Sequence, residues 1–383
     1  MIATMDSVLA FARAKQNDTI ALIREFVECE SPSDNPEAVN RFVELAAAKV
    51  QGVAKVRAFA GGRFGKNLRC EFLLPGAKKQ GQILALGHSD TVWPMGTIAS
   101  MPFRHEKGRL WGPGVLDMKS GIAFFLIAMQ ALRELDRPVR RKVVLQINSD
   151  EEVGSGSSRA LTEQGAKKSA AVLVLEPGTG WEGKLKTARK GVGNYRVTVR
   201  GRASHAGLDF EKGASAVLEL ARQVVKLVEF TRPERGITIN PGVIRGGTRT
   251  NVVAAEAHVE VDVRIAHSKD APWLDRQFQK LRAVDKRCSL EVTGGLNRPP
   301  MERAAGIAKL FGIAKGIAEE LGVIVEESSS GGGSDGNFTA AMGVPTLDGL
   351  GGVGEGAHAV HENIRVDRIA DRTALLARLV EAL

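Results

Sequence analysis

Acidic and histidine side chains recur in this 383-residue chain just after short apolar segments that have the composition of strands. The positions are His88 with Asp90, Asp117, Glu151 with Glu152, Glu176, and His358 with His361. Because ligands of an open α/β sheet gather beyond the carboxyl ends of its strands, we expect these side chains to meet at one sheet edge. A lone histidine there is usually structural, and a lone aspartate often caps a helix. Several carboxylates together, however, repel one another unless cations neutralise them.

The donor types favour zinc. Imidazole and carboxylate groups without thiolates suit zinc, with cobalt or manganese as substitutes. The three cysteines, Cys29, Cys70 and Cys288, are too widely separated to form a CxxC zinc site or a disulfide framework. Adjacent Glu151 and Glu152 leave a strand end in different directions, so one can bind metal while the other faces a water molecule.

The elements that position these residues indicate an α/β protein with a smaller inserted unit. Strands are predicted at 68–74, 82–86, 142–148 and 171–175, and helices at 36–50, 119–135, 304–321 and 367–383. From residue 191 the pattern changes to alternating strands at 194–200, 236–243, 256–265 and 289–293. We therefore expect a discontinuous main domain, 1–190 and 298–383, and an inserted α+β domain, 191–297, with an antiparallel sheet of four strands.

Three motifs occur in order: GHSDTVWP at 87–94, GPGVLDMKSG at 112–121 and DEEVGS at 150–155. Together they resemble the aminoacylase and glutamate-carboxypeptidase superfamily of dizinc peptidases, and within it the bacterial folate-cleaving glutamate carboxypeptidases. The order and spacing of the motifs are similar over nearly the whole chain. The resemblance implies a zinc-peptidase-type catalytic domain, with a mixed central sheet flanked by helices. It also implies that the insert is a dimerisation domain through which a homodimer forms.

The resemblance further implies that the chain binds two zinc ions. It assigns His88 and Glu152 to one ion and Glu176 to the other. Asp117 would bridge the two ions, and a cis peptide bond would join Asp117 to Met118.

The last zinc ligand would come from the segment EGAHAVHE at 355–362. The register of the family makes His358 the ligand. His361 then occupies a position that is usually Asp or Asn in the family. The alternative for His361 is that it is simply a solvent-facing loop residue.

Catalytic roles also follow from the resemblance. Glu151 would be the general base and proton shuttle, which requires a carboxylate within hydrogen-bond reach of the attacking water. Asp90 would orient the His88 ring, although an aspartate at this point can simply form a turn. His205, in GRASHAG at 201–207, would stabilise the developing oxyanion.

Substrate recognition would use basic and polar residues that bind a carboxylate. The positions that resemble substrate contacts of the glutamate carboxypeptidases are Lys184, Asn251, Arg264 and Arg298. Ser334 lies in a glycine-rich loop whose backbone could donate to an anion. Arg264, however, shares a predicted strand face with Glu260 and Asp262, so a salt-bridged surface is the alternative.

The expected function is zinc-dependent hydrolysis of the amide bond of an N-acyl or peptidyl amino acid, such as release of a C-terminal glutamate. The alternatives are an N-acetyl or N-succinyl amino-acid deacylase, a dipeptidase, or a catalytically silent binding protein. The formal charge is +9, but the basic residues are scattered, so we expect no nucleic-acid partner. We also expect no membrane partner and a cytoplasmic location, because the sequence has no signal-peptide pattern and no long uncharged apolar stretch.

Overall fold

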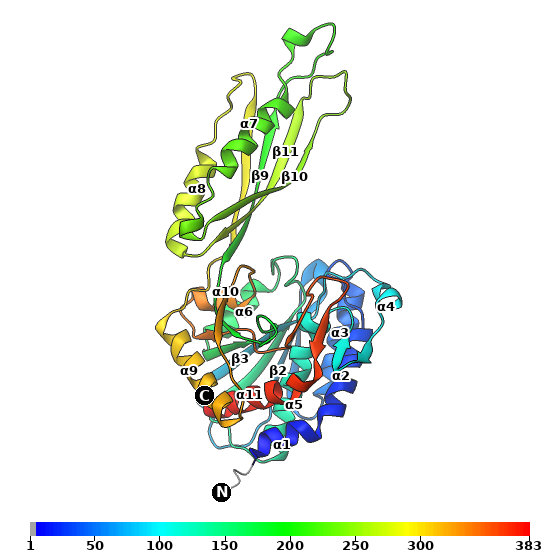
Figure 1. Ribbon diagram of the computed structural model, residues 1–383, viewed down its shortest axis with the longest axis vertical. Helices are drawn as coiled ribbons and strands as arrows, with labels where there is room; N and C mark the ends of the chain where they lie inside the picture. The colour runs from blue at the N-terminus through cyan, green and yellow to red at the C-terminus, as the bar shows by residue number, and fades with distance from the viewer. Residues whose placement is uncertain (1–4) are drawn as a thin grey trace. The chain divides into compact units, whose positions relative to one another are not determined.

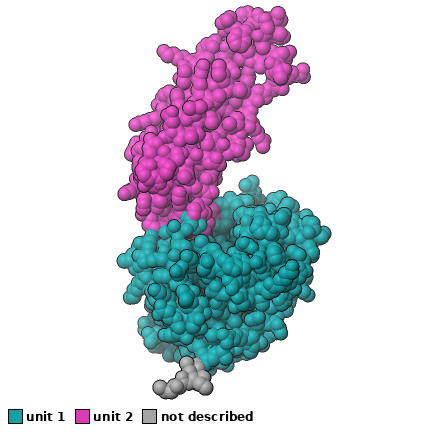
Figure 2. Space-filling model, viewed as in Figure 1, with its two compact units in different colours: residues 1–188, 303–330, 334–383 teal, residues 189–302, 331–333 magenta. Residues whose placement is uncertain are grey.

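The computed structural model describes residues 5–383, and the chain divides into two compact units (Figure 2). Unit 1 comprises residues 1–188, 303–330 and 334–383, and unit 2 comprises residues 189–302 and 331–333. The predicted insert at 191–297 therefore lies inside unit 2, which also takes in the distant glycine segment 331–333.

Unit 1 is built on a mixed sheet of six strands in the order β1, β2, β6, β3, β7, β14. β3 pairs in parallel with β6 and β7, whereas β2 runs antiparallel to both β1 and β6. The carboxyl ends of β3, β6 and β7 therefore lie at one edge, and the mixed α/β class is confirmed. The strand bounds are β1 Ala54–Ala60, β2 Lys66–Phe72, β3 Gln82–His88, β6 Lys142–Asn148, β7 Ser169–Val174 and β14 Thr346–Leu347.

Helices cover both faces of this sheet (Figure 1). Alternate residues of β3 separate the two cores: Ile83 and Ala85 join the larger apolar core, and Leu84 and Leu86 join the smaller one. The helices of the larger core are α1 Ser7–Ala14, α2 Gln16–Glu28, α3 Pro36–Lys49, α5 Ser120–Glu134, α9 Ala305–Glu320 and α11 Ile369–Ala382. On the other face lie α6 Arg159–Ala166 and α10 Gly336–Ala341, and a short helix α4 spans Thr97–Ser100.

The stretch Val115–Glu134, which includes α5, is long and apolar enough by composition to cross a membrane, with a mean hydropathy of 1.5. In the folded unit, 89 % of the most apolar 18-residue window of that stretch is buried. A helix that is apolar on all sides is expected at the centre of a large core, and this position accounts for the composition of α5.

Two smaller sheets complete unit 1. One contains β4 Arg104–Glu106, β5 Arg109–Trp111, β15 Gly354–Glu355 and β16 Asn363–Arg365, and it carries the loop 356–362. The other pairs β8 Leu185–Arg189 with β13 Glu327–Ser330.

Unit 2 has an antiparallel sheet of four strands in the order β10, β11, β9, β12. Alternate residues of β9, such as Tyr195, Val197 and Val199, are buried against the two helices. The Tyr195 ring stacks on Phe278 with centroids 3.8 Å apart. The element bounds are β9 Gly191–Arg200, β10 Thr238–Gly246, β11 Glu256–Ile265, β12 Ser289–Arg298, α7 Ala216–Val228 and α8 Ala271–Gln279.

Candidate metal centre

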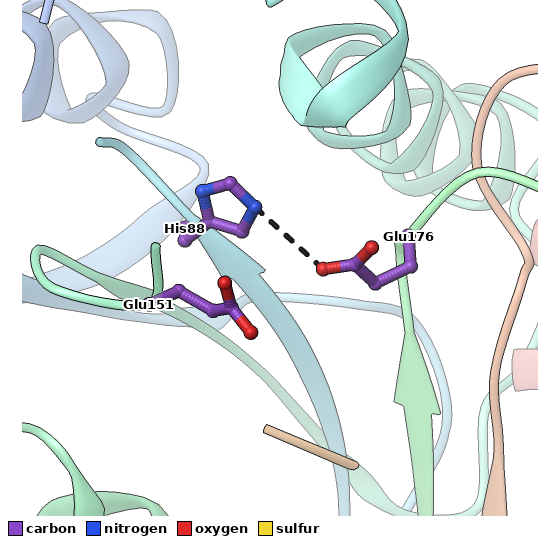
Figure 3. Close-up of side chains that lie close together, drawn as sticks. All are labelled: His88, Glu151 and Glu176. Atoms are coloured by element: carbon purple, nitrogen blue, oxygen red, sulfur yellow. Dashed lines mark ion pairs between the residues drawn. The ribbon is translucent and has the colours of Figure 1, made fainter. Parts of the chain in front are cut away.

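The metal-ligand candidates and the acidic pair after β6 come together in unit 1. Figure 3 shows His88, Glu151 and Glu176 facing one another from three segments of the chain. Each residue of the group lies beyond a strand or in a loop: His88 ends β3, Glu151 and Glu152 follow β6, Glu176 follows β7, Asp117 precedes α5, and His358 lies between β15 and β16.

Asp117 lies between the two histidines. Its Oδ1 is 3.2 Å from Nε2 of His88, and its Oδ2 is 3.4 Å from Nε2 of His358. Glu176 Oε1 is 3.6 Å from Nε2 of His88, whereas Glu152 Oε2 is 3.3 Å from Nε2 of His358. The shortest of these contacts join Glu176 to His88 and Glu152 to His358, whereas the resemblance assigns Glu152 to the same ion as His88. Glu152 also lies within 4.8 Å of both His88 and Asp117.

The donor separations fit divalent cations. A tetrahedral zinc ion with bonds of about 2.0–2.1 Å holds its donor atoms about 3.3 Å apart. The contacts around Asp117 span 3.2–3.6 Å. Glu152 Oε1 is buried and has no hydrogen-bond partner among residues 5–383. Because an unpaired buried carboxylate oxygen is costly, this atom is well suited to a bound cation.

The carboxylates of the cluster need nearby positive charge to stay ionised. Burial lowers the pKa of His88, but hydrogen bonds to Asp117, Asp90 and Glu176 outweigh burial and hold that pKa well above its usual value. Hydrogen bonds to Asp117 and Glu152 raise the pKa of His358 to about 10. Burial opposes ionisation of Asp117, yet the two histidines hold its pKa far below the usual range. Protonated imidazoles and bound metal ions are therefore alternative ways to neutralise the same carboxylates.

Asp90 connects the histidine strand to the acidic pair. The Nδ1 atom of His88 is 2.9 Å from the Asp90 carbonyl oxygen and 3.5 Å from its carboxylate. The carboxylate accepts hydrogen bonds from the backbone N–H groups of Glu151 and Glu152 at 3.1 Å, and from the Ser33 hydroxyl at 2.8 Å. The shortest contact to the His88 ring thus comes from the Asp90 backbone, while its side chain holds the turn that presents Glu151 and Glu152.

Glu176 is held in place by the loop 349–352. The Gly351 N–H donates to the Glu176 carbonyl at 2.8 Å. Fully buried Arg372 supports the loop, because its guanidinium donates to the carbonyls of Gly351, Gly349 and Gly183. Gly351 must be glycine here, since a Cβ atom would lie 2.1 Å from the Leu175 oxygen.

Glu362 fixes the backbone of Asp117. Its Oε1 accepts the N–H groups of Leu116 at 2.8 Å and Asp117 at 3.0 Å. Its Oε2 accepts the Gly114 N–H and the Trp93 indole N–H, both at 2.9 Å. Burial raises the pKa of Glu362 to about 7, and the three backbone donors and the indole oppose that rise. This carboxylate joins the segments that carry His88, Asp117 and His358.

Sequence reasoning missed the part played by Glu362 and Trp93. Both residues lie inside the quoted motifs, at 87–94 and 355–362, so position in a motif was the available signal. Nothing in the spacing of residues 93 and 362 indicates that they meet in the fold.

Glu362→Gln should destabilise the metal-free protein by at least about 2 kcal/mol at pH 8, because the new amide N–H group would face two backbone or indole donors and leave them unpaired. Urea unfolding in EDTA measures this change. Glu355→Gln, at the end of β15 just before the loop, is the matched control, because it removes only an exposed ion pair with Arg109 and should cost less than about 1 kcal/mol. Equal losses for the two variants would show that Glu362 does not anchor the turn.

Two of the predicted substrate contacts lie in unit 1 and already have protein partners. Lys184 forms an ion pair with Glu326 at 2.6 Å, which raises the pKa of the lysine. Ser334 is fully buried, and its hydroxyl donates to Asp348 at 2.6 Å while accepting the Gly336 N–H at 3.1 Å. The Ser334 side chain thus supports its own loop.

His205 and Asn251 lie beside one another in unit 2, where residues 205 and 252 form a β-bridge. The Nδ1 atom of His205 accepts the N–H groups of Gly207 and Leu208, both at 3.1 Å. Because Nδ1 is the acceptor, the neutral imidazole carries its proton on Nε2, which remains a hydrogen-bond donor on an exposed side chain.

The two arginines expected to bind substrate also lie in unit 2. Arg264 forms the strand-face ion pair that its spacing allows, with Nη2 2.8 Å from Asp262, and its Nη1 donates to the Gly331 carbonyl at 3.3 Å. Arg298 ends β12 and is buried.

The backbone places a cis peptide bond between Asp117 and Met118, as the resemblance implies. His358 has a left-handed φ of 62°, a conformation that non-glycine residues rarely adopt. His361 is exposed, and it is His358 that lies within ion-pair distance of Asp117 and Glu152.

Comparisons with known proteins identify the family of this chain. Residues 84–382 match peptidase family M20/M25/M40. Carboxypeptidase G2 from a Pseudomonas species is 30 % identical over 98 % of this chain and 92 % of the relative. Succinyl-diaminopimelate desuccinylase from Acidovorax ebreus is 29 % identical over 74 % of this chain and 76 % of the relative. The aminopeptidase PepT of Bacillus cereus has the same fold, with a TM-score of 0.77 at 23 % identity, covering 96 % of this chain and 98 % of that one. The chain therefore belongs to peptidase family M20/M25/M40 and is a metallopeptidase-type hydrolase.

Proposed function

We propose that this protein is a two-zinc hydrolase that cleaves the amide bond of an N-acyl or peptidyl amino acid. The observation that carries the proposal is the convergence of two histidines and three carboxylates, with Glu151 beside them, at one sheet edge. Similarity to carboxypeptidase G2 supports a carboxypeptidase that releases a C-terminal amino acid such as glutamate.

For the ligands we propose the division that the contacts favour. His88 and Glu176 would hold one ion, Glu152 and His358 would hold the other, and Asp117 would bridge them. The support is that each histidine lies 3.3–3.6 Å from its own glutamate and 3.2–3.4 Å from a different oxygen of Asp117. Zinc is preferred because the donors are nitrogen and carboxylate oxygen, and cobalt or manganese can substitute.

His358→Ala should lower the zinc content of the purified protein from two ions per chain toward one. The affinity for the second ion should fall by at least about 100-fold. His361→Ala, a neighbouring exposed histidine, is the control and should keep both ions. Metal analysis after dialysis against a weak chelator measures the content. If His361→Ala lost the ion and His358→Ala kept it, the ligand role would pass to His361.

The proposed mechanism assigns proton transfer to Glu151. When bound, the metal ions would lower the pKa of a water molecule and polarise the scissile carbonyl. Glu151 takes the proton of that water and later delivers it to the leaving amine nitrogen. As the resemblance implies, His205 would stabilise the oxygen that becomes negative in the transition state, and its exposed Nε2–H group is a donor suited to that role.

Glu151→Gln should keep the metal content and lower kcat by at least about 100-fold, because the amide cannot accept the proton of the water. Glu152→Gln, the adjacent residue, should instead lower the metal content. Metal analysis and steady-state hydrolysis of an acyl-glutamate measure both effects. Full activity of Glu151→Gln would remove the residue from the role of base.

The preferred substrate class is one with a free carboxylate next to the scissile amide. The proposed contacts are Arg298, Arg264, Lys184 and Asn251, with the loop of Ser334.

A hydrolysis panel of acyl-glutamate, acyl-aspartate, N-acetyl-ornithine and simple dipeptides separates the proposed carboxypeptidase from a deacylase or a dipeptidase. Similarity to the desuccinylases favours the deacylase as second candidate. No turnover of any of these substrates by a zinc-loaded protein would favour the silent binding protein.

We also propose that unit 2 forms a homodimer. Apolar side chains are exposed on α7, with Val225 65 % and Leu218 54 % exposed, and on the edge strand β10, with Ile244 57 % exposed. An open strand edge beside an apolar helix face is a surface that pairing with a second copy would cover.

The proposed cytoplasmic location is supported by the three free cysteines.

Val225→Glu combined with Ile244→Glu should convert the dimer to monomer, because each carboxylate would be buried in an apolar interface. Gln279→Glu at the exposed end of α8 is the control and should leave the oligomeric state unchanged. Sedimentation velocity measures the mass. A wild-type monomer at micromolar concentration, or a double variant that is still dimeric, would contradict the proposed interface.

A further inference from the structure

A basic pocket lies in unit 1 on the outer part of the central sheet. Alternate residues of the edge strand β1 face one side, and these are Lys55, Arg57 and Phe59. In the β1–β2 register, Arg57 lies directly opposite Arg69, and Lys55 lies opposite Glu71. Gly165 near the end of α6, and Lys168 after it, also line the pocket, whose volume is about 290 Å³.

The pocket is strongly positive. Four cations line it, Lys55, Arg57, Arg69 and Lys168, against one carboxylate, Glu71. That carboxylate has a partner outside this group, because Glu71 lies 3.9 Å from Lys142. Lys55, Arg57 and Lys168 form no ion pair with any residue in the range 5–383.

The two guanidinium groups are held together despite their like charges. Phe59 lies beside both, with its ring centroid 4.7 Å from Arg57 Cζ and 5.4 Å from Arg69 Cζ. Arg69 is oriented by hydrogen bonds to Gln146 at 2.8 Å, Gln164 at 3.2 Å and the Leu161 carbonyl at 2.5 Å. Like charges directly opposite each other across two strands are destabilising. A bound anion would attract both guanidinium groups and so offset their mutual repulsion.

We propose that this pocket binds a small multiply charged oxyanion, either free phosphate or the phosphate group of a small metabolite. Arg57, Lys55 and Lys168 would supply the donors, and the Arg69 side chain would add fixed positive charge. The site is separate from the metal centre. Gln82 lines the pocket at the first residue of β3, and His88 is the last residue of that strand. At about 3.3 Å per residue, the two ends of β3 are roughly 20 Å apart.

The test compares Arg57→Gln/Lys168→Gln with a control of equal charge, Lys309→Gln/Lys315→Gln. The control lysines lie on the exposed face of α9, which packs near β14 at the opposite edge of the sheet. Calorimetric titration of each zinc-loaded protein uses inorganic phosphate and, separately, glycerol 3-phosphate, in sodium chloride of constant ionic strength. All of the proteins keep the metal centre, so binding of phosphate to zinc contributes equally to each.

The expected result is a saturable binding event in the wild type and the control that is at least tenfold weaker in Arg57→Gln/Lys168→Gln. Whichever ligand binds more tightly identifies the source of the phosphate group. Unchanged hydrolytic activity of the pocket variant shows that it is folded. Equal binding by the pocket variant and the control, or no saturable binding by the wild type, would overturn the proposal.

The like-charge contact gives a second, independent readout. In sodium chloride, Arg57→Gln should melt at the same temperature as the wild type or higher, because the substitution removes repulsion from Arg69. Added phosphate should then raise the melting temperature of the wild type more than that of the variant. A variant that melts lower in chloride and gains as much from phosphate would contradict the proposed site.

Discussion

Mutual repulsion among the carboxylates of Asp117, Glu152 and Glu176 is the constraint on which the rest of unit 1 depends. Their side chains are 15 %, 7 % and 9 % exposed, so water screens them poorly. In such surroundings carboxylates stay ionised only beside cations, and the two imidazoles approach different oxygens of Asp117. The same arrangement leaves a buried oxygen of Glu152 without a protein partner. A cluster of this kind is stable only if the scaffold holds it and cations occupy it.

The scaffold holds each carboxylate through its backbone. Glu362 binds the N–H groups of the turn that contains Asp117, and the Asp90 carboxylate binds those of Glu151 and Glu152. Glu176 is tied to the loop whose carbonyls accept hydrogen bonds from Arg372. Backbone anchoring leaves the carboxylate side chains free for cations. Close packing completes the arrangement, because a Cβ atom on Gly121 of α5 would lie 2.0 Å from the Leu175 carbonyl oxygen.

Much of this arrangement follows from local sequence. The parallel strands β3, β6 and β7 are short apolar runs that end at polar residues, so the gathering of His88, the acidic pair and Glu176 could be predicted from the pattern alone. The pairing within the cluster could not, because it depends on the directions of side chains that leave different strands and loops. Glu152 lies 3.3 Å from Nε2 of His358, although it also lies within 4.8 Å of His88. The ion pair of Lys184 with Glu326 shows the same limit, since a lone basic residue in a sequence does not reveal its partner. The ion pair of Arg264 with Asp262, in contrast, was one of the two alternatives that their shared strand face allowed. The net charge of +9 is distributed unevenly between the two units. Unit 2 carries 20 Lys and Arg against 13 Asp and Glu, which accounts for +7 of it.

The most direct test of the account is a crystal structure of the zinc-loaded protein with anomalous diffraction measured on both sides of the zinc absorption edge. The account predicts two zinc peaks per chain, one within bonding distance of His88 and Glu176 and one of Glu152 and His358. Each oxygen of Asp117 should bind one of the two ions. A single zinc peak, or two peaks that Asp117 does not bridge, would contradict it.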